Sequence, residues 1–399
     1  MSLWLDPALP SEVDVVVIGG GIAGVSVAYQ LAREGVSVAL FESRQIGSGA
    51  SGRNDGQLLL GLGEHYNRIV SQFGTEKARM LWEFIRDNNN NLKTTVMQMP
   101  SVDLQRRGGI RMAETEQEFA ELQEAADLLH GEGRVCGLLS KQALCDILPV
   151  RGFHGALTLQ GEAIVQPAEM TKGIARLAVG AGAKIYERQQ VVDIVDGNDS
   201  QQVVILQDGR SVRTYMVVHC TAGLGTHLDK SGFLKSQIFP YRGQIIATDP
   251  LDGSKASAFD GYAMSSNFCY EYFRTYQNQF IIGGMRWSVK GQEEHTTDDT
   301  VINPDITANL KAYVDKHLPT LNGVDFPYSW SGIMAGTNDG LPLVGAIPGQ
   351  SGSLALLAFN GYGLSFAYRA AEVIKDYVVD GKSSAPASSL FNPRRFIND

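Results

Sequence analysis

The chain has 399 residues, of which 44% are hydrophobic and 19% are charged. This length is too great for one small core and suits two or three compact units, and the composition excludes a wholly disordered chain and a coiled coil. The formal net charge of −9 gives the protein as a whole no attraction to nucleic-acid phosphates or anionic lipid. No stretch reaches the roughly 20 apolar residues that span a bilayer. The first dozen residues have neither a basic start nor an apolar run, so we expect no signal peptide and a cytoplasmic location.

Residues 13–18 form a short apolar run rich in β-branched side chains, which predicts a strand buried on both faces of a parallel sheet. The next six residues contain the pattern G-x-G-x-x-G, in which the glycines are Gly19, Gly21 and Gly24. Apolar residues then recur at helical spacing up to Gly35, and a second apolar run over residues 36–41 ends at Glu42. The order strand, glycine turn, helix, strand, acidic residue predicts a dinucleotide site.

Each part of this pattern has a physical role. Gly19 permits the tight turn, Gly21 lets the backbone approach a pyrophosphate, and Gly24 lets the helix pack closely on the strand. The helix N-terminus, which begins near Ile22 and Ala23, offers unpaired amides to the phosphates. Glu42 can accept hydrogen bonds from ribose hydroxyls. The pattern alone does not separate FAD from NAD.

The segment after the second strand distinguishes FAD from NAD. Residues 42–57 read E-S-R-Q-I-G-S-G-A-S-G-R-N-D-G-Q, which resembles the flavin-proximal loop of the D-amino-acid oxidase-like (DAO) superfamily of FAD-dependent oxidoreductases. Within that superfamily the chain is most similar to the γ-glutamylputrescine oxidase, glycine oxidase and sarcosine oxidase group, and the loop S-G-R-N-G-G-Q of the first of these types is the nearest match. Here Asp55 replaces a glycine and changes the charge close to the expected flavin ring.

Later segments match the same superfamily in the same order. They are residues 165–178, 184–193, 216–223, 240–244, 272–274, 280–284 and 330–345. We expect residues 184–193 to form one strand. The resemblance implies an α/β fold in which a Rossmann-like FAD-binding domain of the glutathione-reductase type is interleaved with a mixed-sheet α+β substrate domain. We assign residues 1–95, 150–235 and 330–399 to the FAD-binding domain and residues 96–149 and 236–329 to the substrate-binding domain.

The resemblance and the glycine motif together give a set of expected FAD-binding residues. These are Gly19, Gly21, Ile22, Ala23, Gly24, Glu42, Ser43, Arg44, Ser51, Gly52, Arg53, Asn54, Gln57, Val191, Val192, Thr221, Ala222, Gly223, Asp339, Gly340, Gly361, Tyr362, Gly363 and Leu364. The last four follow an apolar strand at residues 354–359 and begin a helix, whose N-terminus is expected to stabilise negative charge on the reduced flavin. Sarcosine oxidases attach flavin to a cysteine before the stretch that corresponds to residues 339–345. That region has no cysteine here, so we expect non-covalent FAD.

No other site is expected. The four cysteines match no zinc spacing, and the scattered histidines, His65 and His154 among them, are interpreted as structural or solvated. A long helix, or two, is predicted over residues 73–99, where Asn88–Asn91 are interpreted as a solvated face or a break. Catalytic residues stay unknown, because hydride transfer from a neutral amine to flavin does not require a side-chain base. Aromatic candidates for the substrate pocket are Tyr262, Tyr270, Tyr272, Trp330 and Tyr362.

The expected function is oxidation of a C–N bond in a small amine by hydride transfer to flavin, with oxygen as the expected acceptor, giving imine or aldehyde and hydrogen peroxide. Sarcosine oxidase uses a lysine over the flavin to assist oxygen, and residues 280–284 have none here, but other oxidases of the superfamily need no such lysine. Glycine oxidase and its relatives hold a substrate carboxylate with an arginine, and Met334 occupies or adjoins that place here, although Arg242, Arg274 or Arg286 can reach a carboxylate from elsewhere. The alternatives are an α-amino-acid oxidase or dehydrogenase, an FAD-binding subunit of a hetero-oligomeric dehydrogenase, and an NAD-dependent dehydrogenase. The expected partners are the amine and an electron acceptor, with a homo-oligomer left open.

Overall fold

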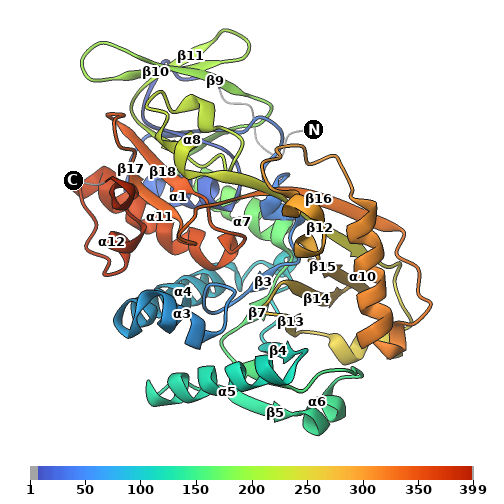
Figure 1. Cartoon of the computed structure of the whole chain (residues 1–399). Coiled ribbons are helices and arrows are strands. Elements are labelled where there is room, and N and C mark those ends of the chain that lie inside the picture. The colour runs from blue at the N-terminus through green and yellow to red at the C-terminus, as the bar shows by residue number, and fades with distance from the viewer. Residues whose placement is uncertain (1–7, 398–399) are drawn as a thin grey trace.

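The computed structural model describes residues 8–397. Residues 1–7, which begin the segment examined above for a signal peptide, and residues 398–399 lie outside the described part. Two eight-stranded sheets and one two-stranded ribbon organise the chain, and the N-terminal and C-terminal segments lie together around the first sheet (Figure 1). Within residues 8–397, no helix combines the length and the hydrophobicity needed to cross a bilayer.

The first sheet carries the glycine motif. Its strands are β1 (Glu12–Ile18), β2 (Val38–Phe41), β8 (Lys184–Tyr186), β9 (Val191–Asp196), β10 (Gln202–Leu206), β11 (Ser211–His219), β17 (Leu343–Ala346) and β18 (Ser353–Leu357). The order β17-β18-β11-β1-β2-β8 has parallel pairs from β18 to β8, and β9 and β10 extend it as an antiparallel meander. The β-branched run of β1 therefore forms the buried central strand that its composition predicts.

Alternating side chains of β1 supply two separate cores. Val15 and Val17 pack with the helices on one face, whereas Val16 and Ile18 pack with the β9–β11 meander on the other. The helices on the first face are α1 (Ile22–Arg33), α4 (Thr75–Val96), α7 (Pro167–Gly180) and α11 (Gly363–Asp380). Because both faces of the strand are covered, its position is fixed from both sides, and the turn that follows it is held rigidly.

The second sheet has the order β16-β12-β15-β14-β13-β4-β6-β5. Its strands are β4 (Gly109–Ala113), β5 (Gly137–Ser140), β6 (Gly155–Leu159), β12 (Phe239–Ala247), β13 (Ala263–Ser266), β14 (Glu271–Tyr276), β15 (Gln279–Gly283) and β16 (Tyr328–Gly336). One face packs against α10 (Pro304–His317) through Ile246, Phe273 and Phe280. Neighbouring residues in the strands, such as Tyr272, consequently point to the opposite face, toward the first sheet's edge.

The remaining strands and helices lie around the two sheets. They are β3 (Gln57–Leu58), which pairs with β7 (Ala163–Ile164), and the helices α2 (Ala50–Arg53), α3 (Tyr66–Phe73), α5 (Glu116–Gly131), α6 (Lys141–Ile147), α8 (Phe233–Gln237), α9 (Gly253–Ala256) and α12 (Ser388–Phe391). The chain passes repeatedly from one sheet to the other, so the predicted α/β fold with a second mixed sheet is confirmed. The assignment of residues to domains stays a prediction.

One sequence expectation was wrong and a second was wrong in part. Residues 184–193 form β8 and the start of β9 rather than one strand. Arg188 between them has a φ of 57°, and its N–H donates to Arg44 O at 2.9 Å while that of Gln189 donates to Glu42 O at 2.9 Å. The intervening residues therefore hydrogen-bond the loop after β2 instead of continuing the strand.

The asparagine run is not a break, because α4 continues through it, and only its second half is a solvated face: Asn90 and Asn91 are exposed, whereas Asn88 and Asn89 are buried. Asn88 Nδ2 donates to Leu364 O at 2.9 Å, and Asn88 Oδ1 accepts from Arg369 N at 3.0 Å. Asn89 Nδ2 donates to Leu59 O at 2.9 Å. The two amides thus fix the first turns of α11 against the loop after β3, and their partners lie too far away in sequence to be inferred from the run itself.

Candidate active site

A cavity of about 630 Å³ runs between the two sheets. At one end it is lined by the turn after β1 and the loop after β2, and at the other end by strands of the second sheet and the start of α11. The glycine motif and the second sheet's inward face therefore border one continuous space. An elongated ligand can contact both.

The turn after β1 is closely packed except toward the cavity. Gly19 has a φ of +107°, and a Cβ there would lie 2.5 Å from Cys220 O. A Cβ on Gly24 would lie 1.8 Å from Gly19 O, whereas a Cβ on Gly21 would meet only the side chain of Ser51, with Oγ 2.8 Å away. The α1 N-cap, Gly21, supplies no side-chain acceptor, and Ser51 Oγ accepts from Ile22 N at 2.9 Å. The other amides of the first turn and the positive dipole end of the helix are directed at the cavity.

Glu42 lies at the carboxyl end of β2 and lines the same part of the cavity. Its Oε2 accepts a hydrogen bond from Gly20 N at 2.7 Å, and its Oε1 accepts one from Arg44 N at 2.7 Å. These amides fix the orientation of the carboxylate. Oε1 also accepts from Ser43 Oγ at 3.3 Å, whereas Oε2 keeps a further lone pair for a hydroxyl donor, as a ribose requires.

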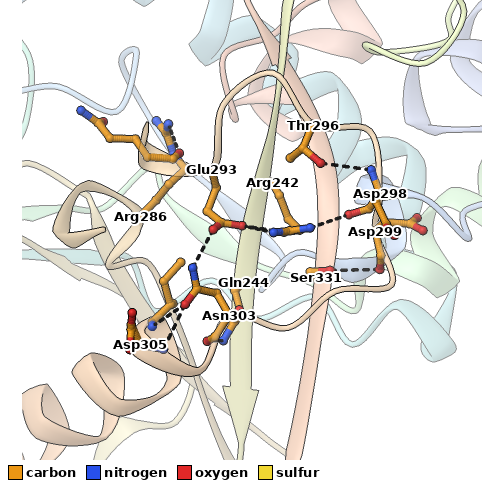
Figure 2. Close-up of polar contacts among 12 residues, drawn as sticks. Arg242, Gln244, Arg286, Glu293, Thr296, Asp298, Asp299, Asn303, Asp305 and Ser331 are labelled. Atoms are coloured by element: carbon orange, nitrogen blue, oxygen red, sulfur yellow. Dashed lines mark hydrogen bonds and ion pairs between the residues drawn. The ribbon is translucent and has the colours of Figure 1, made fainter. Parts of the chain in front are cut away.

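A strap from the second sheet crosses to this loop, and we define it as residues 286–303, between β15 and α10. Arg242 of β12 donates to Asp298 O at 2.9 Å and forms a buried ion pair with Glu293, while Ser331 Oγ of β16 donates to Asp299 O at 3.0 Å (Figure 2). The carboxylate of Asp299 pairs with Arg44 at 2.7 Å and with Arg53 at 3.1 Å. The strap thereby joins the second sheet to the loop that carries Glu42.

The opposite end of the cavity is rich in aromatic side chains. Tyr241 of β12 lies opposite Met334 of β16 in the antiparallel register, and both line the cavity. Arg286 lies with its guanidinium 4.4 Å from the centre of the Tyr241 ring, and its Nη1 lies 3.3 Å from Glu294 Oε1. This end of the cavity therefore combines an apolar surface with one ion pair, in which Glu294 balances the charge of Arg286.

The N-terminus of α11 also borders the cavity. Residues 361–364 line it, and no acidic side chain stands in the first turn of the helix. Ser365 Oγ donates to Leu59 O at 2.8 Å, which adds to the contacts of Asn88 and Asn89 in holding this turn. A fixed, uncapped helix N-terminus can stabilise negative charge that develops on a bound ring.

Most of the expected FAD-binding residues line this cavity. They are Gly19, Gly21, Ile22, Ala23, Glu42, Ser43, Arg44, Ser51, Asn54, Gln57, Val191, Thr221, Ala222, Gly340, Gly361, Tyr362, Gly363 and Leu364. The other six lie behind the wall or away from it: Gly24, Gly52, Arg53, Val192, Gly223 and Asp339. Gly24 and Gly52 face backbone oxygens at 1.8 and 2.1 Å, Val192 is exposed on β9, and Asp339 pairs with Arg395.

The substrate-pocket candidates divide in the same way. Tyr270, Tyr272 and Tyr362 line the cavity. Tyr262 lies outside it, under the guanidinium of Arg107 at 4.2 Å, and Trp330 donates its indole N–H to Arg53 O at 2.7 Å. Sequence reasoning missed Tyr241, Glu64, Glu294 and Asp299, which also line the cavity. Tyr241 could have been found from the sequence, because Tyr241 directly precedes Arg242 in a segment that was assigned to the substrate domain.

The remaining titratable side chains do not assemble a second site in the described residues. No group of three or more histidine, cysteine or acidic side chains within residues 8–397 could hold a metal ion. His65 is buried with its Nε2 3.5 Å from Glu118, and burial lowers its pKa from the ordinary value. It is not among the residues that line the cavity.

Comparison with known proteins gives a consistent result. The family model described as FAD dependent oxidoreductase (DAO) matches residues 14–377. The chain is 26% identical over 368 residues to the gamma-glutamylputrescine oxidoreductase of Escherichia coli (strain K12), covering 91% of this chain and 83% of that protein. It is also 26% identical over 351 residues to the glycine oxidase of Geobacillus kaustophilus (strain HTA426), covering 85% of each.

Solved structures share the fold. L-proline dehydrogenase from P. horikoshii superposes with a TM-score of 0.81 at 23% identity, covering 97% of this chain and 98% of that one. Glycine oxidase from Geobacillus kaustophilus superposes with a TM-score of 0.79 at 22% identity, covering 98% and 100%. The FAD of the matched family fits the residues described here: the cavity offers the N-terminus of α1, a fixed carboxylate at Glu42 and a second helix N-terminus at its far end.

Proposed function

This chain belongs to the FAD dependent oxidoreductase (DAO) family, and from that premise we propose that it oxidises the C–N bond of a small amine whose reacting carbon carries no carboxylate. When bound, FAD supplies the two-electron acceptor for this reaction. The matching relatives include proteins named for an amine and for an amino acid, so the choice between these classes depends on the charges that face the substrate.

The observation that carries the proposal is that each arginine near the substrate end already has an acidic or carbonyl partner in the protein. Arg242 forms its ion pair with Glu293 and is turned toward the strap (Figure 2). Arg274 donates to Val165 O at 2.6 Å and does not line the cavity. Arg286 does line it, but Glu294 neutralises its charge at 3.3 Å.

The remaining wall favours an alkyl chain. Met334 and Gly243 form part of it, and burying a carboxylate against such a surface without a free cation costs several kcal/mol. An amine requires no such partner once it has lost its proton. The tyrosine rings and the thioether instead exclude water and hold the alkyl group against the start of α11, which lies at the same end of the cavity.

We expect butylamine to reduce the flavin more efficiently than norvaline, the α-amino acid that carries the same chain plus a carboxylate. The expected ratio of kcat/KM is at least about a hundredfold, equivalent to about 2.7 kcal/mol of differential stabilisation. The measurement is the anaerobic loss of visible flavin absorbance over a concentration series of each compound. Secondary amines belong in the same series.

Arg286→Met provides the control for this comparison. If the Arg286–Glu294 pair is only part of the wall, the variant retains the preference for amines. A preference of the native enzyme for norvaline, abolished in Arg286→Met, would identify Arg286 as a carboxylate-binding residue and replace the proposal with α-amino-acid oxidation.

We also expect FAD to be held non-covalently. Cys220 and Cys269 line the cavity, but burial raises the pKa of both thiols, and a thiol that stays protonated is a poor nucleophile. Precipitation of the purified protein with acid should therefore release all of the yellow colour into the supernatant. Flavin that stays in the pellet would contradict this prediction. Oxygen as acceptor and a cytoplasmic location are part of the same proposal.

A further inference from the structure

One carboxyl group in the cavity wall has no ion-pair partner and also has an oxygen that accepts no hydrogen bond within the described residues. The charged groups that line the cavity are largely matched: Glu42 accepts from two backbone amides, Asp299 pairs with Arg44, and Glu294 pairs with Arg286. Asp55 differs. It lies in the loop between α2 and β3, is 9% exposed, and its Oδ2 accepts no hydrogen bond within residues 8–397.

The surroundings of Asp55 contain more acceptors than donors. The Gln57 side chain and the backbone N–H groups of Gln57 and Asp55 lie within hydrogen-bonding reach of the carboxyl, yet Asp55 Oδ2 accepts none of them. Gln57 Nε2 already donates to Met264 O at 3.0 Å, and Gln57 Oε1 also has no donor. Buried acceptors are nearly always hydrogen-bonded in native proteins, and each one left unpaired costs about 1–3 kcal/mol. Both Asp55 and Gln57 line the cavity, so the missing donor can come from a molecule bound there.

We propose that Asp55 is the residue that binds the positively charged nitrogen of the substrate, which makes the cavity selective for cationic amines. This inference deepens the proposed function and rests on it. An alkylammonium carries three N–H donors and one positive charge, and it matches two unpaired acceptors and one negative charge. Asp55 is shielded from water, and unit charges attract each other more strongly in such an environment than in bulk solvent. The interaction between Asp55 and an ammonium group is therefore expected to be strong.

The neighbours of Asp55 define when it is charged. Burial raises the pKa of Asp55 to about 6, against the opposing effect of Arg274 on β14. Tyr272, also on β14, is the other titratable group beside it, and burial keeps that phenol neutral by raising its pKa. Asp55 is therefore an anion above pH 6 and becomes neutral as the pH falls through 6, so its attraction for a cation is present at high pH and is lost at low pH.

A bound water between Asp55 and Arg274 would account for the same unpaired atoms, because Arg274 Nε also has no partner within the described residues. That arrangement gives Asp55 a structural role only. It predicts that removing the charge lowers stability, leaves Arg274 uncompensated and does not change the affinity for amines. The two arrangements therefore differ in a binding measurement.

The test uses tert-butylamine, which has no C–H bond on the carbon that bears nitrogen and cannot be oxidised there, and tert-butanol as its neutral analogue. Each is titrated into the FAD-loaded protein while the visible flavin spectrum and the heat of binding are recorded. For Asp55→Asn we expect affinity for tert-butylammonium to fall at least about tenfold at pH 7.5, equivalent to about 1.4 kcal/mol, with tert-butanol changed less than about twofold. The native protein should approach the variant's affinity below pH 6.

Glu64→Gln tests the rival carboxylate, because Glu64 also lines the cavity and its Oε2 accepts no hydrogen bond within the described residues, although it lies 3.6 Å from Arg68. It should bind both probes as the native protein does. Three outcomes would overturn the inference. In Asp55→Asn, both probes could bind equally more weakly, or the affinity for tert-butylammonium could stay unchanged while the melting temperature falls. In the third outcome, only Glu64→Gln loses affinity. Charge-dependent binding without reduction of flavin by any oxidisable amine would instead reject the proposed function and leave Asp55 as a cation-binding residue.

Discussion

We expect Gly24→Ala to yield protein with neither FAD nor the native melting temperature. The added Cβ would lie 1.8 Å from Gly19 O and 3.0 Å from Gly19 C, and both are backbone atoms that no rotamer change can move. Relief requires α1 to move away from β1. The helix packs against both α7 and α11, so the movement would open contacts on two further surfaces (Figure 1), and overpacking of a dense core costs about 1–3 kcal/mol or more.

Two other glycines make this prediction specific. A Cβ on Gly21 would meet the Ser51 side chain, which can rotate, so Gly21→Val should fold but exclude the pyrophosphate and purify colourless. A Cβ on Gly180, in the last turn of α7, would meet nothing within 4 Å, so Gly180→Ala should match the native protein. The flavin absorbance per protein and the melting temperature are measured for all three. Full flavin content in Gly24→Ala would show that the turn is not the close contact described here.

The cofactor end of the cavity was predictable from sequence because its parts are local. The strand, the glycine turn and the helix follow one another, and Glu42 ends the next strand of the same unit. Gly19 and Gly24 are required by backbone contacts with Cys220, directly after β11, and within the turn itself, whereas Gly21 faces only the Ser51 side chain and the cavity. A short pattern with a physical reason at every position is sufficient in such a case.

The substrate end could not be predicted in the same way, since it is assembled from distant segments. Tyr241 meets Met334 only because β12 and β16 pair in one register, and a shift of one residue would turn both side chains to the other face. Asp299 pairs with Arg44 from within the strap, and the strap has no regular pattern of hydrophobic residues in its sequence. The pairing of charges that leaves Arg286 neutralised is likewise a property of the folded chain.

The asparagine run illustrates the opposite error. Four consecutive polar residues in a helix usually face solvent, and that expectation decided the interpretation of Asn88–Asn91. Asn88 and Asn89 are instead completely buried, and their amides bond backbone groups of α11 and of the loop after β3. A buried polar residue signals a distant partner, but sequence alone does not reveal the burial.

The second large effect is expected at a buried ion pair beneath the loop that lines the cavity. Arg111 of β4 and Glu162 are both almost fully buried. Arg111 donates to Glu162, to Leu60 O and to Glu64 O, and Glu162 Oε1 accepts from Leu60 N at 2.8 Å. The pair therefore joins residues 59–64, several of which line the cavity, to the second sheet.

Glu162→Ala should lower the free energy of unfolding by about 3–5 kcal/mol, because it leaves the Arg111 charge buried without compensation. Urea unfolding of the FAD-loaded protein, followed by tryptophan fluorescence, measures the change in midpoint. Glu121→Ala removes the partly exposed pair with Arg68 and should change the free energy by at most about 1 kcal/mol. The double variant Arg111→Met, Glu162→Leu should recover much of the loss, since neither charge then remains. Equal effects of Glu162→Ala and Glu121→Ala would mean that water reaches Arg111 and that the loop is held by other contacts.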